Sequence, residues 1–140
     1  MVDDRLQGSE PDETLKFLVN KFSMLEGRQP RVMVCRSRED QADTKINEIS
    51  VDLAGFGFDV DIGIPFNSVG KLGMNAIEND VDILVLLAPE SELRQSFFLQ
   101  LKEFFSESGY SDLLVLNQLE HLTLHEFKKE LTVWLDQTLP

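Results

Sequence analysis

The stretches that decide the fold are Arg31-Val32-Met33-Val34-Cys35 and, further along the chain, Gly57-Phe58-Asp59-Val60-Asp61-Ile62-Gly63. Each contains a short strand rich in β-branched and apolar residues, and the second is bounded by glycines. The segment 40–54 between them has apolar residues at helical spacing. A strand, a helix and a second strand in this order predict a parallel βαβ unit.

The same alternation continues to the end of the chain. Val81–Leu87 is an apolar run typical of a strand buried on both faces of a parallel sheet, and Asp112–Leu116 is a predicted fourth strand. Apolar spacing predicts helices over Glu13–Leu25, Asn67–Glu78 (with Asn67 or Ser68 as N-cap), Ser91–Ser106 and Leu124–Leu135. The predicted fold class is α/β: a flavodoxin-like (Rossmann-like) doubly wound parallel sheet of four or five strands with flanking helices.

Composition narrows the classes of partner. With 140 residues, 42% of them hydrophobic, the chain suffices for one compact domain. We expect a flexible leader over 1–12, a lead-in helix and linker over 13–29, and the α/β domain over 30–140. The formal charge of −12 argues against binding to nucleic acid or to an anionic membrane. A single cysteine and the lack of a signal-like N-terminus predict a cytoplasmic location.

Several segments together resemble one known family. They are Glu26-Gly27-Arg28, Pro30-Arg31, the run from Gly57 to Gly63, and Ala76-Ile77-Glu78-Asn79-Asp80-Val81-Asp82. This arrangement resembles the cobalamin-binding module at the C-terminus of methylmalonyl-CoA mutases, in which a basic-Pro-Arg lead-in precedes the first strand. The resemblance runs from Leu18 through Leu135 and fades after Ala88. It implies a flavodoxin-like scaffold and directs attention to the loops that hold cobalamin in that family.

The resemblance also implies that the cobalt ligand is missing. In the family the loop after the first strand carries Asp-x-His-x-x-Gly, and here the matching stretch is Asp40-Gln41-Ala42-Asp43-Thr44-Lys45. Ala42 replaces the ligating His and cannot coordinate a metal, and Lys45 replaces the closing Gly. Asp40 survives, with no imidazole to orient.

Two further contacts of the family with the cofactor are replaced. Its Ser-x-Leu after the third strand becomes Leu87-Ala88-Pro89, and its Gly-Gly after the fourth becomes Gln118-Leu119, whose side chains would fill the space next to the buried nucleotide tail. Three losses at three contact sites predict that the ancestral adenosylcobalamin site is gone. We therefore expect no cofactor, no catalytic residue and no metal in this chain.

The leading hypothesis follows from a kept scaffold and a lost site. Methylmalonyl-CoA mutases of the two-subunit kind pair a catalytic large chain with a related small chain that has lost cobalamin. The sequence is similar to that small subunit, which predicts a non-catalytic member of a mutase (isomerase) heterodimer. Its partner would be the mutase large subunit or the barrel domain of its own subunit. A free-standing corrinoid-binding or carrier module is the alternative, and a flavodoxin-like enzyme using Cys35 is the third hypothesis.

The sequence does not favour the other chemistries found on flavodoxin-like scaffolds. Cys35 at a strand end beside Arg36 could be a reactive thiolate, but Gln41 stands where the phosphatase pattern needs Arg, which favours a buried structural thiol. A receiver domain needs acidic residues after the first strand, where this chain has Arg36-Ser37. Leu72 replaces the Ser or Thr of a phosphate loop after Gly70-Lys71. His121 and His125 lack a third ligand at metal-site spacing.

Overall fold

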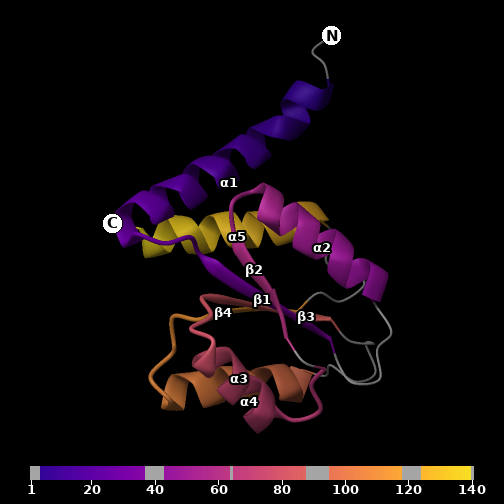
Figure 1. Ribbon diagram of the computed structural model, residues 1–140, viewed down its shortest axis with the longest axis vertical. Coiled ribbons are helices and arrows are strands. Elements are labelled where there is room, and N and C mark those ends of the chain that lie inside the picture. Colours follow the sequence, from indigo (N-terminus) through magenta and orange to yellow (C-terminus); the bar gives the residue numbers. More distant parts are fainter. Residues whose placement is uncertain (1–3, 37–42, 64, 88–94, 118–123, 140) are drawn as a thin grey trace.

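The computed structural model describes residues 4–36, 43–63, 65–87, 95–117 and 124–139 (Figure 1). Its centre is a four-stranded sheet of β1 (Arg31–Arg36), β2 (Asp59–Ile62), β3 (Ile83–Leu87) and β4 (Leu114–Asn117). All neighbouring strands are parallel and their order is β2-β1-β3-β4. This order confirms the predicted flavodoxin-like sheet. No fifth strand is found among the described residues.

Five helices cover the two faces of the sheet: α1 (Asp4–Glu26), α2 (Asp43–Gly55), α3 (Val69–Glu78), α4 (Gln95–Glu107) and α5 (Leu124–Thr138). Figure 1 shows α1, α2 and α5 on one face, and α3 and α4 on the other. The chain moves in one direction along the sheet from β1 to β2 and in the other from β2 to β3 and β4. Because each crossover is right-handed, this reversal places the connecting helices on opposite faces. The sheet is therefore doubly wound, as predicted.

Each helical layer closes its own half of the core. One buried cluster joins the face of the sheet below α1, α2 and α5, and the other joins the opposite face to α3 and α4. Strand β3 lies in the middle of the sheet and every one of its residues is buried. This explains the uninterrupted apolar run in its sequence, since side chains that point to either face meet a helix layer.

Helix α1 is longer than the sequence pattern predicts. It begins at Asp4, within the predicted leader 1–12, and not at Glu13. Its apolar stripe is buried in the same cluster as the sheet and α5; the stripe consists of Leu15, Leu18, Val19 and Phe22. The stripe is covered in this way because these side chains would otherwise leave an apolar face in water.

Helix α3 begins as the sequence predicts. Ser68 has an extended backbone, and its side chain accepts a hydrogen bond from the Lys71 backbone N–H at 3.2 Å. Of the two N-cap residues considered, Ser68 is the one that caps the helix. Gly73 within this helix packs directly on the Phe104 ring of α4, where a Cβ atom would lie 2.4 Å from a ring carbon. The close approach of the two helices explains a glycine in a helix interior.

Candidate functional site

The carboxyl edge of the sheet is the place where ligands of this fold class bind. The described strands end there at Arg36, Ile62, Leu87 and Asn117. Residues 37–42, 88–94 and 118–123 lie outside the described residues, and so do the predicted motif positions Asp40 and Ala42. Lys45 lies near the start of α2.

A shallow pocket of about 410 Å³ opens beside the ends of β1 and β2. Its lining includes Arg36 and Gly63 from the strand ends together with Ile46 and Asn47 from α2. Arg36 is half-buried and Ile62 is 58% exposed. The pocket therefore combines one cationic side chain with mostly apolar walls.

Apolar side chains near the ends of β3 and β4 are buried. Val85, Leu87 and Leu116 are exposed by 0%, 1% and 5%, although they stand near the carboxyl ends of β3 and β4. They belong to one buried cluster with Phe127 and Leu131 of α5. These side chains are therefore packed into the core on the face of the sheet that carries α5.

Cys35 is a core residue. Its side chain is 0% exposed, and burial raises the pKa of the thiol from 9.0 to about 12, an effect that a hydrogen bond with the Gly63 backbone partly opposes. At neutral pH the thiol is protonated and inaccessible, whereas a nucleophilic cysteine needs an exposed thiolate. The structure thus supports the structural role for Cys35 and removes the basis for an enzyme that uses it.

Gly63 explains why this thiol is enclosed. A Cβ atom at this position would lie 2.4 Å from Cys35 Sγ and 2.9 Å from Met33 Sδ. The Gly63 backbone N–H donates a hydrogen bond to the Val34 carbonyl at 3.0 Å. The run from Gly57 to Gly63, noticed in the sequence for its resemblance to a family, therefore has a local packing reason for its last residue.

The remaining motifs considered in the sequence gain no support as sites. Gly70 and Lys71 lie within α3, so they form a helix and not a phosphate-binding loop. His121 lies outside the described residues, and His125 belongs to the first turn of α5. Within the described ranges no group of three or more His, Cys, Asp or Glu side chains is placed to hold a metal ion. The same ranges contain no helix with the length and apolar character of a membrane span.

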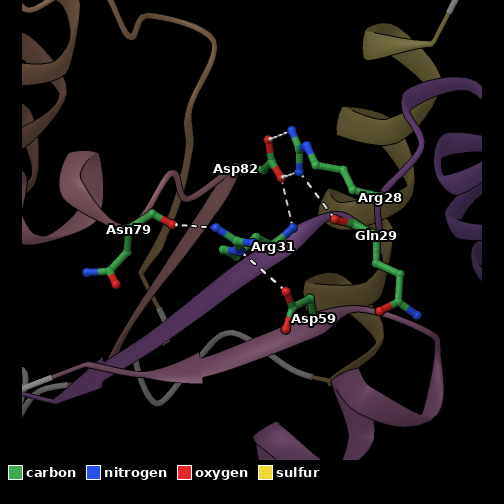
Figure 2. Close-up of polar contacts among 6 residues, drawn as sticks. All are labelled: Arg28, Gln29, Arg31, Asp59, Asn79 and Asp82. Atoms are coloured by element: carbon green, nitrogen blue, oxygen red, sulfur yellow. Dashed lines mark hydrogen bonds and ion pairs between the residues drawn. The ribbon is translucent and has the colours of Figure 1, made fainter.

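Sequence reasoning missed a polar cluster at the opposite, amino edge of the sheet (Figure 2). The Asp82 carboxylate accepts two hydrogen bonds from the Arg28 guanidinium, at 2.7 and 3.0 Å, and one from the Arg31 backbone N–H at 2.8 Å. The Arg31 side chain contacts Asp59 at 3.3 Å and donates to the Asn79 carbonyl at 2.9 Å.

This cluster joins the lead-in before β1 to the starts of β2 and β3. The sequence signal existed, since Arg28, Pro30-Arg31 and the turn before Asp82 all belong to the segments that resemble the mutase module. The sequence did not indicate which of these charged side chains would pair with each other. Only the strand order β2-β1-β3 brings Asp59 and Asp82 to either side of Arg31.

A four-stranded parallel sheet with helices on both faces defines the class of this protein as a flavodoxin-like α/β domain. No family model matches the chain. It is 38% identical over 69 residues to the methylmalonyl-CoA mutase large subunit of Porphyromonas gingivalis, a match that covers 49% of this chain and 10% of that relative.

Two further relatives extend this finding. The chain is 32% identical over 98 residues to the methylmalonyl-CoA mutase of Cereibacter sphaeroides, with 70% of this chain and 14% of the relative covered. It is 40% identical over 63 residues to the mitochondrial methylmalonyl-CoA mutase of Mus musculus, with 45% and 8% covered. The protein is thus a domain related to methylmalonyl-CoA mutases, and its matches span at most 14% of the length of these relatives.

Proposed function

We propose that this chain is the degenerate, non-catalytic cobalamin-binding-like domain of a methylmalonyl-CoA mutase small subunit or a closely related cytoplasmic partner. It acts by associating with a mutase chain and not by chemistry of its own. The observation that carries the proposal is Ala42, in place of the cobalt-ligating His, on a chain that is similar to mutases. An alanine methyl group has no lone pair to give to cobalt.

The strand ends support the same proposal. A buried nucleotide tail needs open space next to the ends of the central strands, and small residues whose backbone it can approach. Here Leu87 is 1% exposed and Leu116 is 5% exposed, both in contact with the cluster under α5. This burial supports our proposal that the tail of adenosylcobalamin has no place here, and we derive no chemistry through that cofactor.

The short span of the matches supports a role by association. The relatives are methylmalonyl-CoA mutases or mutase large subunits, and the match covers 8 to 14% of each. Mutase catalysis would also need a part that binds the substrate. In our proposal that part belongs to the partner, which is the large subunit in a heterodimer or a barrel domain in the same polypeptide.

Association with a mutase chain is the direct test. The protein carrying an affinity tag is expressed in its native host and recovered under mild conditions, and we expect a mutase large chain in constant ratio to it. A tagged, unrelated flavodoxin-like protein of similar negative charge serves as the control. Recovery of the domain alone, or equal recovery of the mutase with the control, would contradict the proposal.

A second candidate is a free-standing corrinoid-binding or carrier module, and the similarity to large subunits favours it. In this alternative the domain binds adenosylcobalamin weakly, with the dimethylbenzimidazole base still on cobalt.

Absorbance titration with adenosylcobalamin separates the two candidates. Our proposal predicts no change in the corrinoid spectrum for the natural protein and none for Ala42→His, because one restored imidazole does not reopen the space at Leu87 and Leu116. A base-on complex of the natural protein would support the carrier. A base-off spectrum in Ala42→His would show that only the ligand had been lost, and would contradict the account of the filled tail site.

A further inference from the structure

A second pocket, of about 360 Å³, lies at the amino edge of the sheet, away from the ligand edge. Three aromatic side chains line it: Phe22 of α1, Tyr110 from the turn after α4, and Trp134 of α5. We call it the aromatic pocket. Phe22 is 2% exposed, whereas Tyr110 is 40% exposed. The lining therefore runs from a buried ring to one that faces solvent.

Trp134 is held in place within this pocket. Its Nε1–H donates to the Asp112 backbone carbonyl at 3.0 Å, and its ring centroid is 6.4 Å from that of Phe22. A fixed indole ring with an accessible neighbour is a suitable surface for a cation, because the faces of aromatic rings carry partial negative charge.

Four carboxylates also line the aromatic pocket, from Glu26, Asp80, Asp82 and Asp112. Asp82 is neutralised by its bidentate pair with Arg28. Among the described residues, the carboxylates of the other three make no hydrogen bond or ion pair, and Arg28 is the pocket's cationic side chain. The pocket therefore keeps an excess of negative charge beside its rings.

One guanidinium, that of Arg28, already lies in the lining of the aromatic pocket. The Arg28 guanidinium carbon lies 5.3 Å from the Phe22 ring centroid, while its two terminal nitrogens reach Asp82. The hydrogen bond with Asp82 raises the pKa of Arg28, and the charges of Asp82, Glu26 and Asp80 add to this effect against the opposing effect of burial. The local field thus stabilises a planar cation stacked on a ring.

We propose that the aromatic pocket binds an arginine side chain from a partner polypeptide, with its guanidinium against Tyr110 and Trp134 and paired with Glu26 and Asp112. Arginine fits better than lysine because a planar guanidinium stacks on rings and pairs with carboxylates at the same time. The chain's charge of −12 favours a basic partner segment and opposes a second copy of this chain. The proposal does not depend on our account of the cofactor site, since it concerns the opposite edge of the sheet.

The chain contains a built-in reporter for this pocket. Trp134 is its single tryptophan, so a change in tryptophan emission reports directly on the pocket. The full-length protein is titrated with the peptide acetyl-Gly-Arg-Gly-amide. The control peptide replaces arginine by citrulline, which has nearly the same shape without the charge. We expect a saturable change with the arginine peptide that weakens as salt is added, and none with citrulline.

Matched variants assign the effect to the pocket. Glu26→Gln and Asp112→Asn each remove one lining carboxylate, and each is expected to weaken binding of the arginine peptide by about fivefold. Glu103→Gln removes a similarly exposed carboxylate from α4, which does not line the pocket, and is expected to leave binding unchanged. Thermal unfolding of each variant establishes that it is folded.

Three results would overturn the proposal. The first is an absence of saturable change in Trp134 emission. The second is equal binding of the citrulline peptide, which would show that charge is not recognised. The third is equal weakening by Glu103→Gln and Glu26→Gln, which would show that only the overall charge of the protein attracts the peptide.

Discussion

Gly63→Ala is expected to lower the free energy of unfolding by about 2 kcal/mol, because the new methyl group has no space. Its Cβ atom would lie 2.4 Å from Cys35 Sγ and 2.9 Å from Met33 Sδ, and both side chains are buried. The backbone of Gly63 is not in the left-handed region, so the cost arises from packing alone. Chemical denaturation measures the change, and thermal unfolding should show a midpoint lower by about 8 °C.

The reason for this cost can be tested with a second substitution. Cys35→Ala removes the sulfur atom that is in closest contact, so Gly63→Ala should cost clearly less in that background than in the natural protein. Gly70→Ala is the matched control, since nothing lies within 4 Å of its Cβ position and alanine favours a helix. Equal costs of Gly63→Ala in both backgrounds would show that the thiol is not what excludes the methyl group.

Asp82→Ala is expected to cost about 2 kcal/mol of unfolding free energy, because three N–H groups lose their acceptor together. These are two of the Arg28 guanidinium and the backbone N–H of Arg31. The side chain of Asp82 is only 17% exposed, so water screens its charge little. Arg28 is 44% exposed, so water can replace some of the hydrogen bonds that it loses in the variant. Urea unfolding of the two proteins gives the difference.

Asp59→Ala provides the comparison for this result. Its carboxylate is 46% exposed and makes a single contact with Arg31 at 3.3 Å, so its removal should cost no more than about 0.5 kcal/mol. If the two substitutions cost the same, Asp82 is not the central acceptor of the cluster in Figure 2.

The sequence predicted the elements of the sheet well because their patterns are local. The buried run of β3 and the glycine boundaries of β2 identify strands without knowledge of their neighbours, and Ser68 identifies the start of α3. The full length of α1 was missed because the residues over 4–12 are polar and carry no apolar stripe, so nothing in their periodicity indicates a helix.

For the cofactor site, the sequence could predict only which contacts of the family motif are replaced. Ala42 and the residues after β3 and β4 can be compared with a motif position by position, so the sequence predicts which contacts are replaced. It could not indicate that Leu116 and Phe127 would be buried in one cluster, because this depends on where α5 packs against the sheet. The Arg28 and Asp82 pair was hidden for a similar reason, since strand order alone brings these residues together.

The packing of α1 against α5 has a consequence for the synthesis of the chain (Figure 1). Leu15 and Phe22 leave the ribosome well before Leu131 and Leu135, which belong to the same buried cluster. The apolar stripe of α1 therefore lacks part of its native cover until α5 has been synthesised. During that interval the nascent protein depends on chaperones or on fast elongation to avoid aggregation through this exposed stripe.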